Sequence, residues 1–374
     1  MGMKEKIRVL HVSPFSDLSR GGQRSMVAMV ENMERENIQH EFLMPSEGEL
    51  MDYLTARGYK CHTMKIKDPF NSNPIKAFRS IKQLNKKIKQ GQYDIVHSDG
   101  EGDTLAIGFA KLFTKAKSVW HVRVSGKHKN DIWSYRLANR IITISEGVAH
   151  RFADQKKNKT LTIFNGVDTE VFKPRNKDET KSLLGLKPDL RYVLFAGQMA
   201  KHKGIFDIAQ IAASFPEENI KFNLCGEYLD KKTKQEFERR IQDLQNIEHL
   251  GVKRNIEMYM AASDMLLLPS SEGKEGMGRV MFEAMACGCV PIAYDISGVR
   301  ESVTKETGLL VEEGNWKAMA DNIKELLSHP EKLEDMQKLG RERAIDVFSI
   351  KRHSEKVLSV YEELVMFQKT APSN

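Results

Sequence analysis

The stretch DMLLLPSSEGKEGMGRVMFEAMACG, residues 264–288, joins a short apolar run to a glycine-containing loop and then to a run of helix-forming residues. Asp264–Pro269 ends in proline and predicts a buried strand, whereas Val280–Cys287 predicts a helix that stops at Gly288. The loop between strand and helix contains Glu275. Loops at the carboxyl ends of parallel strands carry the ligand-binding groups of α/β proteins, so this loop is the first candidate site.

Two glutamates stand out in this stretch. Glu275 lies in the loop, and Glu283 lies in the second turn of the expected helix. Gly276 and Gly278 let the backbone approach a ligand closely, and the positive end of the helix favours anionic or hydroxyl-rich partners. Two carboxylates can accept hydrogen bonds from two sets of hydroxyls, as a sugar and a ribose would require. The pattern indicates a sugar-nucleotide site, and a pair of exposed surface carboxylates is the alternative.

Apolar, β-rich runs alternate with helical patterns along the chain. The expected strands are Ile7–Val12, Glu41–Met44, Asp94–His97, Ser118–Val122, Ile141–Ile144, Thr160–Phe164, Tyr192–Phe195, Lys221–Cys225, Asp264–Leu268 and Val290–Ala293. Such alternation predicts parallel strands joined by helical crossovers. The polar segment Lys173–Thr180 separates the first six strands from the last four.

The length of 374 residues exceeds what one hydrophobic core usually supports. We therefore expect an α/β protein with two Rossmann-like, doubly wound domains, residues 1–172 and 173–350, that face a central cleft. A last helix in 351–374 is expected to cross back toward the first domain. Its apolar face comprises Val357, Val360, Tyr361, Leu364 and Val365.

Composition narrows the class of protein. Hydrophobic residues make up 40% of the chain and charged residues 29%, and no apolar run approaches the roughly 20 residues that span a bilayer. The four cysteines lack zinc-ligand spacing and are expected to be reduced thiols. These features predict a cytoplasmic globular protein.

The net charge of +7 is concentrated in the first half, where residues 1–172 carry 28 Lys and Arg against 19 Asp and Glu. Its densest stretch, Pro74–Gln90, predicts a basic amphipathic helix. The apolar residues expected beneath the basic face are Ile75, Phe78, Ile81, Leu84 and Ile88. This face is either simply solvated or a patch for an anionic membrane or acceptor. Nucleic acid is disfavoured because aromatic residues rarely interleave with the basic ones.

Three loops of the first half lie where this architecture places ligands. Gly21 and Gly22 follow the first strand and offer backbone donors to a phosphate or acceptor, although a plain turn uses the same residues. His121 and Arg123 end another strand, and a satisfied core histidine is the alternative for His121. Asn165 begins Asn-Gly-Val-Asp, which a simple turn also explains.

In the second half the expected strand Tyr192–Phe195 is followed by Gly197, Gln198 and a lysine-rich turn that ends at Lys203-Gly204. An ammonium group near a leaving diphosphate offsets the charge that develops on it, so Lys203 is a candidate catalytic residue. A solvated loop lysine is the alternative.

Together these motifs closely resemble the GT-B glycosyltransferases of the retaining family four, over nearly the whole chain. The family has the motif Gly-Arg-Leu, followed after three residues by Lys-Gly; this chain matches it with Gly197-Gln-Met199 and Lys203-Gly204. The family also has Glu-Gly-Phe-Gly with a second Glu eight positions after the first, and the stretch from Glu275 to Glu283 matches this motif. The resemblance implies that Glu275 and the backbone of Gly276, Met277 and Gly278 hold the transferred sugar. It further implies that Glu283 holds the ribose, Lys203 the diphosphate, and that His121 faces the sugar near its sixth carbon.

One departure bears on activity. The family has Arg where this chain has Gln198, and a neutral amide cannot replace that charge beside the diphosphate. Three explanations are open: Arg279 supplies the charge, Lys201 supplies it, or the site is weakened. The working hypothesis is that Arg279 or Lys201 replaces the missing charge and that the enzyme is active. Met277 in place of the family's aromatic residue is a milder change.

The resemblance implies a retaining, metal-independent hexosyltransferase that uses a UDP-sugar or GDP-sugar as co-substrate and needs no cofactor. The basic first half suggests an anionic or lipid-linked acceptor, such as an intermediate of a surface polysaccharide, with the protein at the cytoplasmic face of the membrane. A sugar-nucleotide epimerase and a non-catalytic partner protein remain alternatives. The expected nucleotide-base side, Leu250–Lys253, does not identify the base.

Overall fold

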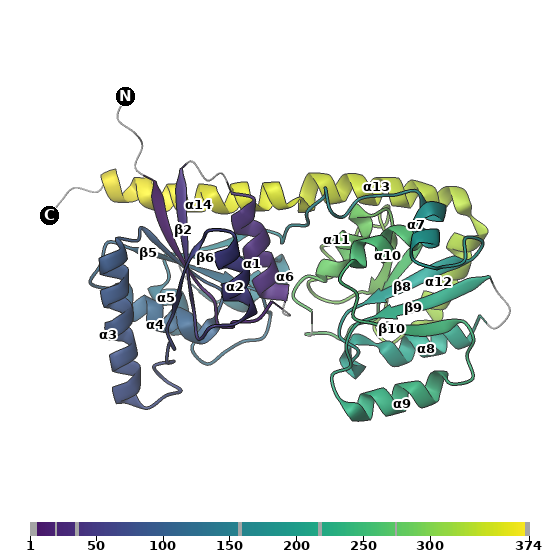
Figure 1. Ribbon diagram of the computed structural model, residues 1–374, viewed down its shortest axis with the longest axis horizontal. Coiled ribbons are helices and arrows are strands. Elements are labelled where there is room, and N and C mark those ends of the chain that lie inside the picture. Colours follow the sequence, from purple (N-terminus) through teal and green to yellow (C-terminus); the bar gives the residue numbers. More distant parts are fainter. Residues whose placement is uncertain are drawn as a thin grey trace. The chain divides into compact units, whose positions relative to one another are not determined.

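The computed structural model of the protein describes residues 6–18, 21–33, 37–155, 159–215, 219–273 and 275–370 (Figure 1). The chain forms two compact units: unit 1 is Met1–Gly166 with Ile350–Asn374, and unit 2 is Val167–Ser349. The first break lies slightly before the expected boundary at 172. The backbone N–H of Val167 donates to the carbonyl of Phe348 at 2.7 Å, which ties the start of this segment to unit 2.

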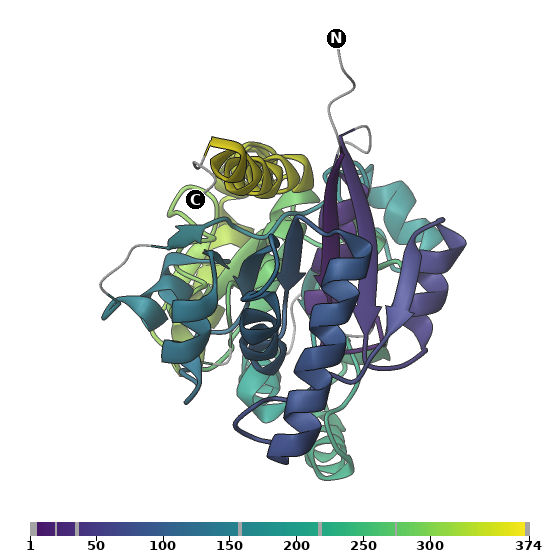
Figure 2. The ribbon, with the colours of Figure 1, turned by 90° about the vertical axis from the view of Figure 1, so that its left-hand side faces the viewer.

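Unit 1 contains a parallel sheet with the strand order β3-β2-β1-β4-β5-β6-β7. Its strands are β1 (Ile7–Val12), β2 (Ile38–Met44), β3 (Lys60–Thr63), β4 (Ile95–Ser98), β5 (Lys117–Val122), β6 (Arg140–Thr143) and β7 (Thr160–Thr162). Its helices are α1 (Gly21–Glu31), α2 (Glu49–Ala56), α3 (Pro74–Gly91), α4 (Glu101–Lys111), α5 (Asp131–Leu137), α6 (Glu146–Ala149), the short 3₁₀ helix His150–Phe152, and α14 (Ile350–Thr370). Figure 2 shows α3 and α4 side by side against this sheet.

Unit 2 repeats the design with the strand order β10-β9-β8-β11-β12-β13, again all parallel. Its strands are β8 (Arg191–Ala196), β9 (Ile220–Cys225), β10 (Ile247–Gly251), β11 (Met265–Leu268), β12 (Val290–Tyr294) and β13 (Leu309–Val311). Its helices are α7 (Lys177–Leu183), the 3₁₀ helix Lys201–Lys203, α8 (Ile205–Ala213), α9 (Lys231–Ile241), α10 (Ile256–Ala262), α11 (Arg279–Ala286), α12 (Trp316–Ser328) and α13 (Pro330–Phe348). Helices cover both faces of the sheet (Figure 1).

The expected fold class is confirmed, since each unit is a doubly wound parallel sheet. The ten expected strands are all present, and β3, β10 and β13 are additional. Strand β3, Lys-Cys-His-Thr, is a half-exposed strand at the edge of the sheet. It lacks the apolar run that identifies central parallel strands in a sequence, and it was therefore not expected.

The last helix packs on unit 1. Val357, Val360, Tyr361 and Leu364 are buried, so most of the expected apolar face is used. The Ser354 hydroxyl donates to the carbonyl of Met29 on α1 at 2.9 Å. Helix α14 thereby joins a core built from the amino-terminal strands.

Helix α3 forms as expected, but the expectation that Ile75 and Phe78 lie beneath its basic face is wrong. Ile75 is 63% exposed and Phe78 68%. The buried residues are Ala77, Ser80, Leu84 and Ile88. These follow one helical stripe, so the small side chains of the first turns face inward and the larger ones are turned outward. Within the described residues, the structure contains no helix with the length and apolarity of a bilayer span.

Candidate functional site

Each sheet reverses its strand order at one point, between β1 and β4 in unit 1 and between β8 and β11 in unit 2. Ligands of doubly wound proteins bind beside the carboxyl ends of the strands at such a point. The loops that follow β1, β5 and β7 carry the unit 1 candidates, and those that follow β8 and β11 carry the unit 2 candidates.

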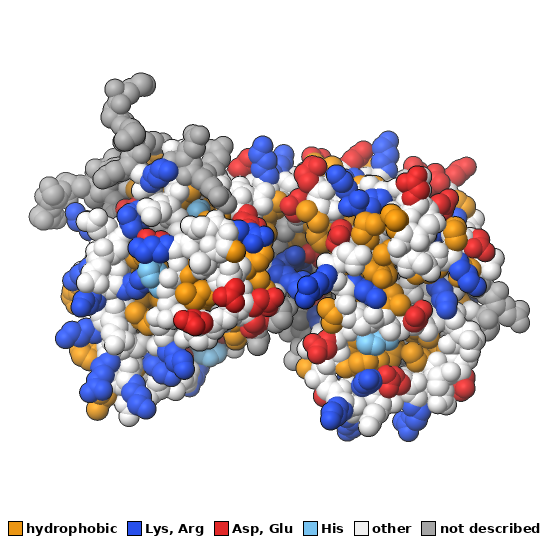
Figure 3. Space-filling view, in the orientation of Figure 1, with side chains coloured by type: hydrophobic (Ala, Val, Ile, Leu, Met, Phe, Trp, Pro, Cys, Tyr) orange, Lys and Arg blue, Asp and Glu red, His pale blue; other side chains and the backbone are white. Residues whose placement is uncertain are grey.

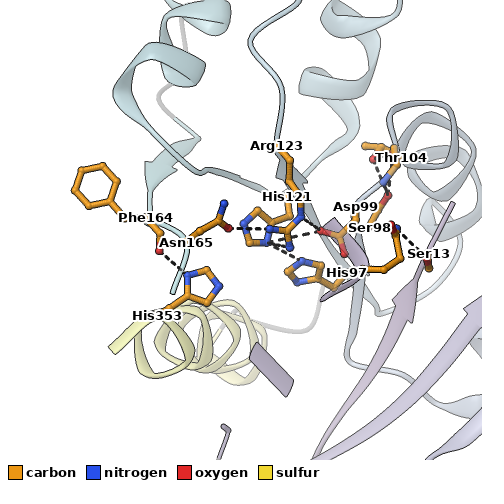
Figure 4. Close-up of polar contacts among 12 residues, drawn as sticks. Ser13, His97, Ser98, Asp99, Thr104, His121, Arg123, Phe164, Asn165 and His353 are labelled. Atoms are coloured by element: carbon orange, nitrogen blue, oxygen red, sulfur yellow. Dashed lines mark hydrogen bonds and ion pairs between the residues drawn. The ribbon is translucent and has the colours of Figure 1, made fainter. Parts of the chain in front are cut away.

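In unit 1, Arg123 joins the candidate loops (Figure 4). Its Nε donates to Asp99 Oδ1 at 2.9 Å, and its Nη1 donates to Asn165 Oδ1 at 2.9 Å. A Cβ built on Gly22 would lie 3.4 Å from Arg123 Cδ, so the start of α1 lies against the same side chain. Gly21 is the exposed first residue of α1. Arg123 thus connects three loops that are distant in sequence.

His121 is fully buried beside Arg123. Its Nδ1 lies 3.3 Å from His97 Nε2 and 3.5 Å from Arg123 Nη2. Burial lowers the pKa of His121 well below its usual value, and the charge of Arg123 lowers it further. The imidazole is therefore neutral near pH 7.

Sequence reasoning missed the residues that support His121. His97 is the last residue of an expected strand, and Tyr361 was assigned only to an apolar face. In the structure the Tyr361 hydroxyl lies 2.6 Å from His97 Nδ1, and His353 stacks on His121 with 5.8 Å between ring centroids. His97 at the carboxyl end of a strand was the available signal.

His97, Asp99 and His121 place their ligand atoms within 4.8 Å of one another, which is a spacing that metal sites use. The guanidinium of Arg123 lies against this group, with its Nε 2.9 Å from Asp99 Oδ1 and its Nη2 3.5 Å from His121 Nδ1. A dication there would be repelled by a permanent positive charge, so the group fits an anionic or hydroxyl-bearing ligand better.

In unit 2, Lys203 and Glu275 form an ion pair between the turn after β8 and the loop after β11. The Ser270 hydroxyl also donates to Glu275 Oε1, at 3.0 Å. Lys203 and Glu275 lie 72 positions apart in sequence, and both side chains are mostly buried. The structure therefore brings together the expected diphosphate cation and the expected sugar carboxylate.

Glu283 lies on α11 and is 8% exposed. Its carboxylate accepts a hydrogen bond from Arg279 Nε at 2.6 Å, one helical turn away. Arg279 thus holds Glu283 in place. Lys274, which belongs to the same loop motif, lies outside the described residues.

The backbone around Glu275 requires glycine. Gly278 caps α11 with φ of 62°, a conformation that other residues rarely adopt. A Cβ on Gly298 would lie 2.4 Å from the Gly276 carbonyl oxygen. Met277 is buried, and its carbonyl accepts from the Ser302 hydroxyl at 2.7 Å. These contacts fix the backbone from Gly276 to Gly278 at the start of the helix.

At the end of β8, the Gly197 N–H donates to the Cys225 carbonyl at 2.9 Å, and a Cβ on Gly226 would lie 1.7 Å from the Gly197 carbonyl oxygen. Sequence reasoning missed Gly226. The neighbouring side chains of Gln198 and Lys201 are exposed.

Two cavities of unit 2 border these loops. One of about 480 Å³ is lined in part by Lys201, Gly204 and Pro269. The other, of about 500 Å³, is lined in part by Tyr228, His249 and Gly251. The second contains part of the segment expected on the nucleotide-base side, and the Tyr228 and His249 rings lie 4.5 Å apart there.

Comparison with known families accounts for this arrangement. Residues 176–343 match the family of glycosyl transferases group 1, and residues 19–171 match glycosyltransferase family 4. The chain belongs to the GT-B glycosyltransferases of the family-4 type. Both halves of this glycosyltransferase are thus matched, and the resemblance noted from the motifs is confirmed.

The glycosyltransferase has characterised relatives. It is 29% identical over 212 residues to the N-acetyl-alpha-D-glucosaminyl L-malate synthase of Bacillus anthracis. The aligned residues make up 56% of this chain and about half, 54%, of that relative. It is 26% identical to the UDP-Gal:alpha-D-GlcNAc-diphosphoundecaprenol alpha-1,3-galactosyltransferase of Escherichia coli, with 96% of the chain and 98% of the relative covered. The crystal structure of Anabaena HepE in complex with UDP shares the fold, with a TM-score of 0.84 at 18% identity over 96% of the chain and 100% of HepE.

Proposed function

We propose that this glycosyltransferase moves a hexosyl group from a nucleoside diphosphate sugar to an acceptor with retention of the anomeric configuration and without a metal ion. Unit 2 binds the donor. The observation that carries this proposal is the Lys203–Glu275 pair, which lies in the loops at the reversal point of the unit 2 sheet. A cation for a diphosphate and a carboxylate for sugar hydroxyls are there in direct contact.

Donor binding separates Lys203 from Glu275 and gives each of them a new partner on the donor. The diphosphate carries more negative charge than one carboxylate, so Lys203 transfers its hydrogen bond from Glu275 to the diphosphate. Glu275 is then free to accept from the sugar hydroxyls, with Ser270 still donating to it at 3.0 Å. Glu283, which Arg279 holds at 2.6 Å, accepts from the ribose hydroxyls.

The proposed donor is a UDP-sugar. The Escherichia coli relative takes UDP-galactose by its name, and HepE is described in complex with UDP. The cavity of about 500 Å³ beside Tyr228 and Gly251 is large enough for a base and is the proposed base site. A GDP-sugar is the alternative that a donor screen distinguishes.

The proposed chemistry is a front-face displacement. Glu275 and Glu283 serve as hydrogen-bond acceptors for hydroxyls, and neither is assigned as a covalent nucleophile. The acceptor oxygen bonds to the anomeric carbon, the bond from that carbon to the diphosphate breaks, and the departing phosphate oxygen takes the acceptor proton. Lys203 stabilises the charge on the leaving group. His121 donates a hydrogen bond to the transferred sugar, and Gly21, Gly22, Arg123 and Asn165 form the acceptor or phosphate side.

The charge that Gln198 lacks is proposed to come from Arg279 or Lys201. Arg279 already pairs with Glu283, whereas Lys201 is exposed in the same turn as Lys203. The working hypothesis stays that one of them compensates and the enzyme is active.

The test is incubation with UDP-sugars and GDP-sugars, with and without extracted lipid-linked glycans. Transfer predicts release of nucleoside diphosphate that the acceptor stimulates, at least about tenfold over hydrolysis alone, with an α-linked product from an α-linked donor. A new sugar nucleotide without release would instead establish an epimerase. Tight donor binding with neither reaction would establish a non-catalytic partner protein.

The proposed acceptor is lipid-linked, and unit 1 carries a surface that fits a membrane. Phe70 and Trp133 have ring centroids 6.5 Å apart, and both are about half exposed. Ile75 and Phe78, one turn apart on α3, add two more exposed apolar side chains. The exposed Lys76 and Arg79 lie on the same turns of α3.

Charge complementarity selects an anionic lipid surface as the occupant. Figure 3 shows Lys and Arg side chains gathered over the side of unit 1 that carries α3. Each cation near such a surface contributes about 1 kcal/mol, and buried aromatic and aliphatic side chains add to it. This surface supports the proposal that the protein attaches peripherally to the cytoplasmic face of a membrane.

We expect the protein to float with vesicles that contain phosphatidylglycerol and to stay behind with vesicles of phosphatidylcholine alone. The double change Ile75→Ser and Phe78→Ser removes two exposed apolar side chains and should lower vesicle binding at least about tenfold. Leu183→Ser on unit 2, where Leu183 is 78% exposed, is the matched control and should bind as the wild type does. Equal flotation with both vesicle types, or unchanged binding of the double variant, would refute the membrane surface.

A further inference from the structure

We propose that Tyr361 on α14 acts through His97 to place the ring proton of His121 on Nε2, so that His121 presents an N–H donor to its ligand. Tyr361 and His97 are positioning residues in this scheme. The tautomer concerns unit 1 alone, and only its use toward the transferred sugar rests on the proposed function.

The direction of the hydrogen bonds follows from Arg123. A guanidinium donates and never accepts, so its Nη2, 3.5 Å from His121 Nδ1, requires a lone pair on that nitrogen. Arg123 cannot turn away easily, because Asp99 and Asn165 hold it through two bonds of 2.9 Å. His121 Nδ1 is therefore unprotonated.

His97 must then point its proton at His121. The two ring nitrogens, His97 Nε2 and His121 Nδ1, lie 3.3 Å apart, and two lone pairs at that distance would repel each other. His97 Nε2 therefore carries a hydrogen, which leaves its Nδ1 as the acceptor for the Tyr361 hydroxyl at 2.6 Å. The chain of donors runs from Tyr361 through His97 to His121.

The rings must be neutral for a tautomer to matter, and they are. Burial lowers the pKa of His97 to about 3 and that of His353 to about 4, and it lowers the pKa of His121 well below its usual value. Burial also raises the pKa of Tyr361 far above its usual value, so the phenol keeps its proton. One tautomer of His121 then accounts for both hydrogen bonds of its Nδ1, those with His97 and Arg123.

The consequence lies at the other ring nitrogen. His121 Nε2 carries the proton, is buried, and has no hydrogen-bond partner within the described residues. His353 is oriented oppositely, since its Nδ1 donates to the Phe164 carbonyl at 2.7 Å and its Nε2 is an acceptor (Figure 4). An N–H at His121 Nε2 can donate to a hydroxyl oxygen but cannot remove a proton as a general base.

The test is two-bond ¹⁵N–¹H correlation spectroscopy of the full chain with ¹⁵N-labelled histidine at pH 7.5, assigned with His121→Gln. The expected spectrum shows His121 protonated at Nε2 and bare at Nδ1. Tyr361→Phe removes the donor to His97 and should give a mixture of His121 tautomers. Tyr93→Phe is the control, because Tyr93 is a buried tyrosine of the same unit that donates to Glu41 at 2.6 Å. Its spectrum should match the wild type.

Kinetics separate positioning from mere support of the fold. Tyr361→Phe should lower kcat about 10-fold to 100-fold with the KM for the donor little changed, as losing the partner of a ligand-orienting histidine does elsewhere. A wild-type His121 protonated at Nδ1, or a Tyr361→Phe protein with unchanged tautomer, would overturn the proposal. The expected tautomer in a protein without transferase activity would leave this inference standing and refute the proposed function instead.

Discussion

Lys203→Ala is expected to lower kcat/KM about 10²-fold to 10³-fold. The ammonium of Lys203 is the charge assigned to the leaving diphosphate, and losing one preorganised donor to a developing negative charge costs about 3–4 kcal/mol. The loss has a second source, because Glu275 would remain as an uncompensated negative charge beside the diphosphate. Initial rates of nucleoside diphosphate release with a saturating acceptor measure the effect.

A double variant separates the two sources. Lys203→Ala with Glu275→Gln removes the repulsion but not the loss of charge on the leaving group, so kcat should stay at least about tenfold below that of Glu275→Gln alone. Lys305→Ala is the control, because Lys305 lies on unit 2 with its side chain 93% exposed. Turnover of Lys203→Ala within a few-fold of wild type would show that the diphosphate is held elsewhere.

Acidification from pH 7 to pH 5 is expected to destabilise unit 1 strongly. Burial lowers the pKa of His11, His97, His121 and His353 in the folded protein. In the unfolded chain these histidines take up protons near pH 6.5, whereas in the folded chain they stay neutral down to about pH 4 or lower. Stability is therefore full above pH 6.5 and is lost as the pH falls, by about 2 kcal/mol per histidine at pH 5.

Two buried acids of the same unit act in the opposite direction. Burial raises the pKa of Asp103 to about 6 and also raises that of Asp99, so both take up protons in the folded state first. The stability that the folded state gains by protonating these two acids offsets part of the stability lost through the four histidines. The net loss remains a large part of the 5–15 kcal/mol that stabilises a typical domain.

Hydrogen exchange followed by mass spectrometry at pH 7 and pH 5, corrected for intrinsic rates, locates this effect. Peptides from β1, β4, β5 and α14 should lose protection at pH 5, and His97→Asn should reduce the pH dependence. Unchanged protection of these peptides between the two pH values would show that the histidine cluster takes up protons without cost.

The sequence predicts the fold and the unit 2 loops because both depend on local patterns. Apolar runs identify the central strands, and the loop of Glu275 is recognisable from glycines within a few residues. The Lys203–Glu275 contact joins two such loops at one edge of a parallel sheet, where the topology brings them together.

The support of His121 could not be predicted in this way. Tyr361 and His97 are 264 residues apart, and a tyrosine on the apolar face of a helix is indistinguishable by pattern from a packing residue. The exposure of Ile75 and Phe78 was missed for a related reason. Helical periodicity gives the stripe, but the rotation of the helix depends on which side chains fit against the sheet, and here the smaller Ala77 and Ser80 do.

A crystal structure of the protein with a non-hydrolysable UDP-sugar is the most direct test of the central claim. The proposed function predicts sugar hydroxyls within hydrogen-bond distance of Glu275, ribose hydroxyls at Glu283, and the Lys203 ammonium moved from Glu275 to the diphosphate. A sugar nucleotide bound away from these three side chains, or a Lys203–Glu275 pair left intact beside the diphosphate, would contradict the proposed function.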